Sequence, residues 1–157
     1  MLKVSPFLWF DTEAEQAAEL YVSLFKNSKV GAVSRYGESG PGPKGQAMTV
    51  EFELDGLPVT ALNGGPMFKF TEAMSLKVDC ADQAEIDFLW GKLIEGGGAP
   101  SQCGWLKDRF GLSWQIVPHN MGTLIGGPDP AKSGRAMQAM MQMKKLDIAA
   151  LERARAG

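Results

Sequence analysis

Few residues in this chain of 157 have side chains suited to catalysis or metal binding. It has one histidine, His119, and two cysteines, Cys80 and Cys103. Zinc sites are built mainly from histidine and cysteine, so a zinc site is not expected. Nucleophilic catalysis by Cys103 would need a basic neighbour such as His119, Lys107 or Arg109. The alternative, for both cysteines, is a buried and unreactive thiol.

A larger group of polar and aromatic side chains falls on one face of the predicted strands, because successive residues of a strand point to opposite faces. This mixture suits either a solvent-exposed outer face or a partly apolar pocket for a small molecule. Two large aromatic rings, Phe7 and Trp9, favour the pocket, since such pockets combine apolar walls with a few polar groups. The predicted ligand-binding residues are Phe7, Trp9, Glu51, Thr60, Ser75, Lys77, Ser113 and Gln115.

The opposite face of the same strands is almost wholly apolar and is predicted to lie under the helices. Its members are Leu8, Phe10, Met48, Val50, Phe52, Leu54, Met74, Leu76, Val78, Leu112, Trp114 and Ile116.

The elements that carry these faces occur in two similar series, which indicates an internal repeat. The first series is predicted as a strand over 4–10, a helix with an apolar stripe over 14–25, and strands over 30–36, 48–54 and 58–62. The second is predicted as a strand over 73–78, a helix with an apolar face over 86–94, and strands near 102–107 and 112–117.

Local signals predict where these elements begin and turn. Thr12 and Glu15 have the spacing of a capping box, as do Asp82 and Glu85, so each pair is predicted to start a helix. Asp55-Gly56 between two alternating strands predicts a tight hairpin. Asp108 and Arg109, at the turn over 108–111, are predicted to cap the last hairpin or to pair with each other.

Beyond Pro118 the sequence changes from strands to helices. Asp129-Pro130 predicts a helix start, and that helix is expected to run to about Lys144. It carries Met137, Met140 and Met141 on one side, which would pack against the sheet or a second subunit, or offer an adaptable partner surface. Asp147 is predicted to cap a last short helix through Arg153.

The sequence therefore predicts an α+β fold of two βαβββ modules with curved mixed sheets and a C-terminal helical tail. The modules are predicted over residues 1–66 and 67–118, joined by a hinge at Asn63 to Pro66, with the tail over 119–157, all in one domain.

Composition narrows the classes of partner. The formal net charge of −2 gives no basic surface for nucleic acid. No apolar run approaches the ~20 residues of a membrane span, and Lys3 opens a strand rather than a signal peptide. Two cysteines are too few for a disulfide framework, so a cytoplasmic protein with reduced thiols is expected.

Several motifs resemble one known family over nearly the whole chain. They are Pro6-Phe7-Leu8-Trp9-Phe10-Asp11, Leu62-Asn63-Gly64-Gly65-Pro66, Gln83-Ala84-Glu85, Cys103-Gly104-Trp105, the run Asp108 to Pro118, and Met143-Lys144-Lys145-Leu146-Asp147. They are similar to motifs of PhnB-like proteins, which are often described as 3-demethylubiquinone-9 3-methyltransferases. This family belongs to the vicinal oxygen chelate superfamily, with glyoxalase I, extradiol dioxygenases and bleomycin-resistance proteins. The resemblance implies paired βαβββ modules and a homodimer.

The resemblance also implies where a divalent metal would bind, at Ser5, Thr60, Ala73 and Gln115 in this sequence. Only Gln115 could be a ligand, through its amide oxygen, whereas zinc or iron requires imidazole or carboxylate. Glu51 and Glu53 could supply carboxylates nearby. We therefore expect no metal at the superfamily's usual positions.

Methyl transfer would need a site for S-adenosylmethionine, often a glycine-rich turn that leads from a strand into a helix. Gly64-Gly65 follows a strand without opening a helix, and the glycines at 96–98 follow a helix. We therefore expect no cofactor.

Three functions remain open. The first is binding of a small, partly aromatic molecule without a metal, and the second is an enzyme of the glyoxalase and dioxygenase superfamily, or a methyltransferase, acting on a small metabolite. In the second, Glu51, Lys77 or Gln115 would provide the polar groups for the reaction. The third is an interaction protein whose working surface is the methionine-rich tail.

Overall fold

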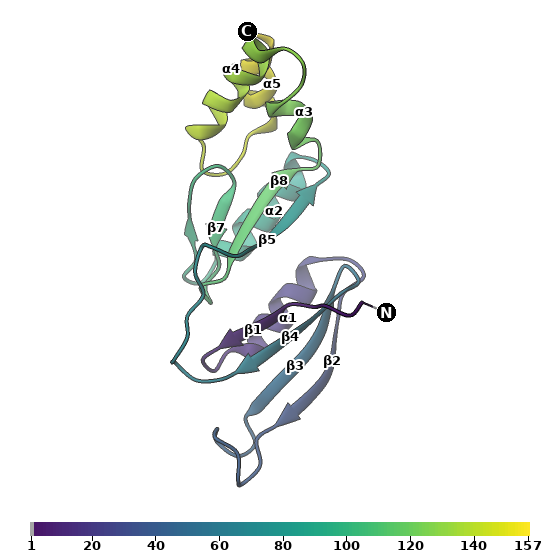
Figure 1. Cartoon of the computed structure of the whole chain (residues 1–157), viewed down its shortest axis with the longest axis vertical. Helices are drawn as coiled ribbons and strands as arrows, with labels where there is room; N and C mark the ends of the chain where they lie inside the picture. Colours follow the sequence, from purple (N-terminus) through teal and green to yellow (C-terminus); the bar gives the residue numbers. More distant parts are fainter. Residues whose placement is uncertain (1) are drawn as a thin grey trace. The chain divides into compact units, whose positions relative to one another are not determined.

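The chain folds into two compact units, each with its own mixed sheet and helix (Figure 1). This computed structural model describes residues 2–157, so Met1, the first residue of the predicted first module, lies outside the described part. The first unit extends to Phe70 and the second comprises Thr71–Gly157. None of the helices over residues 2–157 has the length and apolar content needed to cross a bilayer.

The first unit has the predicted strand-helix-strand-strand-strand order. Its elements are β1 (Phe7–Phe10), α1 (Ala14–Leu24), β2 (Lys29–Arg35), β3 (Ala47–Leu54) and β4 (Leu57–Asn63). The strand order in the sheet is β1-β4-β3-β2. The β1–β4 pair is parallel and the other two pairs are antiparallel, so the sheet is mixed, as predicted.

The second unit repeats the same plan. Its corresponding elements are β5 (Ser75–Cys80), α2 (Gln83–Ile94), β6 (Ala99–Pro100), β7 (Trp105–Lys107) and β8 (Ser113–Pro118). Its sheet order, β5-β8-β7-β6, matches that of the first sheet, again with one parallel pair. The repeat predicted from sequence is confirmed, although the two-residue strand β6 was not predicted.

The predicted apolar face is largely buried in each sheet: eight of its twelve members are buried, and Met48, Leu76 and Val78 are half-buried. Buried side chains of this face include Leu8, Phe10, Val50, Phe52, Leu54, Leu112, Trp114 and Ile116. The prediction is wrong for Met74, which precedes β5 and is more than half exposed. Its position outside a strand explains the error, because alternation holds only where the backbone is extended and paired.

The start of α1 differs from the predicted capping box of Thr12 and Glu15. The helix begins at Ala14, after an N-cap residue that makes no side-chain capping bond. The Ala14 amide instead donates to Asn63 Oδ1 at 2.8 Å, from the end of β4. Asn63 is buried, and its amide nitrogen donates to the Ala47 carbonyl. One side chain therefore joins the start of α1 to β3 and β4.

The other local signals are confirmed. The Asp82 side chain accepts from the Glu85 amide at the start of α2, and Glu85 accepts from the Ala81 amide. Asp55 and Gly56 both have positive φ, as a two-residue hairpin of type I′ requires.

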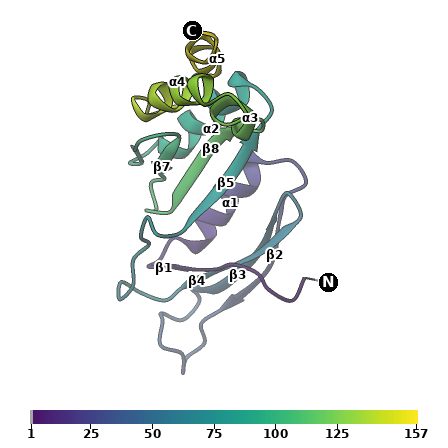
Figure 2. The ribbon, with the colours of Figure 1, turned by 45° about the horizontal axis from the view of Figure 1, so that its top comes forward.

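The tail forms three helices at the end of the second unit (Figure 2). They are α3 (Met121–Ile125), α4 (Pro130–Met141) and α5 (Ile148–Ala156). Asp129 and Asp147 cap α4 and α5 as predicted, but α3 was not predicted and α4 ends before Lys144. On α4, Met137 and Met141 are exposed.

The segment between α4 and α5 attaches the tail to the rest of the unit. The Cys103 and Gly104 amides donate to the carbonyls of Met143 and Lys144, each at 2.8 Å. Leu146 is fully buried next to Gly104. The tail is thus part of the packing of the second unit. A partner surface on its exposed methionines stays a prediction.

Candidate functional site

Four predicted ligand-binding residues lie on one face of the second sheet. Ser75 pairs with Ser113 and Lys77 with Gln115 across β5 and β8. Gln115 Nε2 donates to Ser75 Oγ at 3.0 Å, which links the side chains of β8 and β5 on this face. We call this surface the polar face. It comprises Ser75, Lys77, Trp105, Lys107, Ser113 and Gln115.

Trp105 and Lys107 reach the polar face because β7 pairs with β8 in a fixed register. Trp105 lies opposite Gln115 and Lys107 opposite Ser113, while Leu106 between them points into the core. Sequence reasoning placed a strand here but did not include these two residues among the ligand-binding residues. Their alternation around Leu106 is the signal that could have found them.

The turn between β7 and β8 fixes this register. Buried Asp108 accepts hydrogen bonds from the amides of Phe110 and Leu112 through Oδ1, and from the Trp114 indole through Oδ2 at 2.9 Å. Asp108 therefore caps the hairpin, as predicted. The Arg109 guanidinium lies 4.7 Å from the centre of the Phe110 ring.

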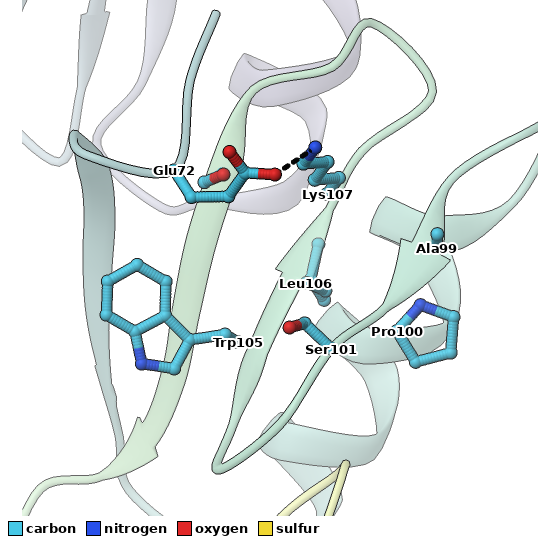
Figure 3. A pocket seen from close by; sticks show the side chains of 8 residues that line it. Glu72, Ala99, Pro100, Ser101, Trp105, Leu106 and Lys107 are labelled. Atoms are coloured by element: carbon cyan, nitrogen blue, oxygen red, sulfur yellow. Dashed lines mark ion pairs between the residues drawn. The ribbon is translucent and has the colours of Figure 1, made fainter.

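A pocket of about 270 Å³ lies at one end of the polar face (Figure 3). An indole ring, an ammonium group, a carboxylate and two hydroxyls contribute to its walls. The lining residues are Glu72, Ala99, Pro100, Ser101, Trp105, Leu106, Lys107 and Ser113. Of the eight predicted residues, only Ser113 lines this pocket. Glu72, Ser101, Trp105 and Lys107 were missed.

An ion pair between Glu72 and Lys107 lies at the pocket (Figure 3). The hydrogen bond from Lys107 is the main reason that the pKa of Glu72 lies below its ordinary value. Glu72 is therefore a carboxylate near neutral pH. It belongs to an irregular segment before β5 and its side chain is 64% exposed, whereas Lys107 belongs to a paired strand.

Ser113 has a buried hydroxyl that lacks a hydrogen-bond partner within residues 2–157. The residue is 1% exposed and lines the pocket. A buried polar group without a partner is costly, because it loses its hydrogen bonds to water and gains none. Such a group in a pocket wall is suited to binding a polar atom of a ligand.

The other four predicted residues lie together on the first sheet. Thr60 pairs with both Phe7 and Glu51, and Trp9 follows Phe7 on the same face. Phe7 is 61% exposed, so this surface offers an aromatic ring to its surroundings. These four residues, Phe7, Trp9, Glu51 and Thr60, form what we call the Phe7 face.

Trp9 is held in place within the first unit. Its indole nitrogen donates to the Gly65 carbonyl at 2.9 Å, and its ring packs edge-on against Phe68 with centroids 4.9 Å apart. A Cβ atom on Gly64 would collide with the Trp9 indole. The glycine at this position thus has a packing role.

The superfamily's metal positions do not fit a metal ion in this chain. Ser5 and Ala73 lie outside the strands, and Thr60 offers only a hydroxyl besides its backbone groups. Gln115 offers a single amide oxygen, while its amide nitrogen donates to Ser75 Oγ. From Leu2 to Gly157, no three His, Cys, Asp or Glu side chains are grouped so that they could hold a metal ion.

The two thiols differ in their surroundings. Burial, and then the nearby carboxylates of Glu85, Asp79 and Asp82, raises the pKa of Cys80 to about 12, so this thiol stays protonated at neutral pH. Cys103 is partly exposed.

The three basic residues considered as partners of Cys103 have other neighbours. Lys107 pairs with Glu72, Arg109 stacks on Phe110, and His119 Nδ1 lies 3.2 Å from the Cys80 carbonyl oxygen. The contacts of these bases favour the unreactive interpretation of Cys103.

Comparison with known proteins gives one family and several related structures. The family model described as 3-demethylubiquinone-9 3-methyltransferase matches residues 2–117. The structure of a PhnB protein from Bacillus cereus is similar at 36% identity and a TM-score of 0.69, over 74% of this chain and 99% of that chain. None of the curated proteins matches the chain.

Two further structures share the fold at lower identity. Protein PA1353 from Pseudomonas aeruginosa is 21% identical with a TM-score of 0.62, over 75% of this chain and 98% of that one. The fosfomycin resistance protein FosX from Listeria monocytogenes, complexed with Mn(II) and sulfate, is 13% identical with a TM-score of 0.51. It aligns over 78% of this chain and 94% of its own length.

Proposed function

Since the chain belongs to the 3-demethylubiquinone-9 3-methyltransferase family of PhnB-like proteins, in the vicinal oxygen chelate superfamily, we propose that it binds a small, partly aromatic molecule. The proposed site is the pocket on the polar face of the second sheet. One observation carries this proposal, namely that an indole ring and four polar side chains line a single pocket. Binding there uses no metal at the superfamily's positions.

The size of the pocket supports a small ligand. Its volume of about 270 Å³ lies just below the usual range for drug-sized molecules, about 300–1,000 Å³. A single substituted ring suits this volume. Stacking on Trp105 contributes only about 0.5–1.5 kcal/mol, so the polar groups must supply much of the specificity.

The family description names a methyl transfer, but the observations here favour binding alone. Gly64 is explained by its contact with Trp9. A Cβ atom on Gly98 would lie 2.7 Å from the Lys107 carbonyl oxygen, so this glycine also has a packing role. One glycine of each group therefore has a packing explanation that involves no methyl donor.

Fluorine NMR of protein labelled with 5-fluorotryptophan tests the proposal. The chain has four tryptophans, and Trp105→Phe assigns the resonance of Trp105. We expect single-ring compounds such as phenol, benzamide and benzoate to shift this resonance saturably. Trp90, buried on α2, is the internal control. If no compound shifts Trp105, or if Trp90 shifts equally, the proposal is wrong.

The Phe7 face remains a predicted ligand-binding surface of the first unit. A saturable shift of the Trp9 resonance would support that prediction. A homodimer also stays a prediction from the family resemblance, and sedimentation velocity tests it. A monomer at micromolar concentration would contradict it.

A further inference from the structure

We propose that the ligand of this pocket is an aromatic carboxylate, and that Glu72 occupies the place of its acidic group on Lys107 when no ligand is bound. This inference rests on the proposed function and names the class of ligand. Glu72 would then act as an internal competitor, leaving Lys107 when the ligand's carboxylate arrives.

The first argument comes from which member of the ion pair can move. Lys107 belongs to β7, whose register with β8 places it opposite Ser113. Glu72 lies in the irregular segment before β5, and its side chain is mostly exposed. The sheet thus holds the backbone of Lys107 at the pocket, while Glu72 lies on an irregular segment and has the more exposed side chain, 64% against 41%. Glu72 is therefore the member that can rotate into solvent. An anionic ligand replaces Glu72 without leaving Lys107 unpaired.

The second argument comes from the hydroxyl of Ser113. This buried group has no hydrogen-bond partner in the described chain, and it lies beside Lys107 in the sheet. A carboxylate has two oxygens, so it can accept from the Lys107 ammonium and from the Ser113 hydroxyl together. The Glu72 side chain pairs with Lys107 but leaves Ser113 unsatisfied. A ligand carboxylate would satisfy both donors.

The third argument comes from Trp105, which lines the same pocket. Its ring gives a flat apolar surface beside the charged group, so a ligand with a ring and an acidic substituent uses both. A neutral ring would have to leave the ion pair intact and would gain only the stacking contact.

The test uses three single-ring probes on the full chain. They are benzoate, its neutral isostere benzamide, and the cation benzylammonium, each titrated against the fluorine resonance of Trp105. We expect benzoate to bind more tightly than the other two. We expect Glu72→Gln to tighten benzoate about two- to five-fold, because exposed ion pairs of this kind are weak competitors. Benzamide binding should not change.

Two further variants test the donors. Lys107→Gln should weaken benzoate at least about tenfold, since it removes a charge-assisted hydrogen bond, while Lys107→Arg should retain binding. Ser113→Ala should weaken benzoate by about two- to tenfold. The matched control is Glu95→Gln, from the exposed Lys92–Glu95 pair on the same unit, with atoms 3.7 Å apart and away from the pocket. It should change neither benzoate nor benzamide affinity.

The outcomes separate this inference from the proposed function. If benzamide binds as tightly as benzoate, or if Glu72→Gln weakens benzoate, the inference is wrong although binding at Trp105 stands. Preference for benzylammonium would also overturn it, because Glu72 would then be the ligand's partner. If no probe shifts Trp105, both proposals fail.

Discussion

Replacing Ser113 with alanine should make the second unit more stable, which is unusual for a buried position. The Ser113 hydroxyl is buried without a hydrogen-bond partner in residues 2–157. Leaving such a group unsatisfied costs roughly 1–3 kcal/mol, and alanine removes this cost. The lost oxygen also removes some packing contacts, which offsets part of the gain. We expect a net stabilisation of about 1 kcal/mol, or a rise in Tm of about 2–4 °C.

The matched control is Ser75→Ala, the same chemical change on the neighbouring strand. Ser75 pairs with Ser113 in the sheet, but its hydroxyl accepts a hydrogen bond from Gln115 Nε2. Removing this acceptor should cost about 0.5–1.5 kcal/mol. The two serines should therefore respond with opposite signs.

The assay is urea unfolding followed through the fluorine resonance of 5-fluorotryptophan at Trp114. Trp114 is buried in the second unit and bonded to Asp108, so its signal reports on that unit. Trp9 reports on the first unit, which matters because two units need not unfold together. If Ser113→Ala leaves stability unchanged or lowers it, the hydroxyl has a partner and the reasoning is wrong. Weaker benzoate binding by the more stable variant would indicate a site kept for function.

Three other changes test the fold and its titration. Asn63→Ala should lower the free energy of unfolding by about 2–4 kcal/mol, because it removes the hydrogen bonds to the Ala14 amide and to the Ala47 carbonyl. A loss under about 0.5 kcal/mol, measured by urea unfolding at Trp9, would contradict this expectation. The pKa of Cys80 is about 12 in the folded protein and 9.0 without its surroundings. Between these two pH values the unfolded chain binds fewer protons than the folded chain. The free energy of unfolding therefore falls as the pH rises from about 9 to 12. The urea midpoint should fall between about pH 8 and about pH 10.5, and this fall should be smaller for Cys80→Ala than for the unmodified protein. Equal falls in the two proteins would show that Cys80 does not cause the pH dependence. Truncation after Pro118 removes buried Leu146 and should destabilise the second unit by about 3 kcal/mol or more, so unchanged unfolding at Trp114 would show that the tail is not packing.

The pattern of the fold could be predicted because it depends on local sequence. Alternation along the strands separated the apolar face from the polar face, and burial confirmed it for eight of the twelve apolar residues. It did not predict that Ser113, on the polar face, would be buried. Asp82 and Asp129 cap helices that start directly after them, so spacing alone was sufficient. The cap of α1 could not be predicted this way. Asn63 lies 49 residues from Ala14, and only the folded sheet brings them together.

The site was predicted less completely than the fold, for the same reason. Ser113 followed from alternation in β8. Lys107 could have followed too, had the hairpin register been worked out from the turn that Asp108 caps. Glu72 could not, because it lies in an irregular segment where no period applies, and its contact with Lys107 spans 35 positions (107 − 72). Long-range contacts from irregular segments carry no pattern in a single sequence.

The absence of metal-binding side chains at the superfamily's positions and the presence of Lys107 on a strand fit one physical account. A divalent ion attracts anionic oxygens but needs several carboxylate or imidazole ligands around it, and Thr60, Ala73 and Gln115 do not supply them. An ammonium on a strand attracts the same oxygens without any such ligands. Its single charge is also easily balanced by one side chain, as Glu72 balances Lys107 here. The affinity for an anionic ring would then depend on how readily Glu72 moves, which makes the Glu72→Gln variant the sharpest measure of this account.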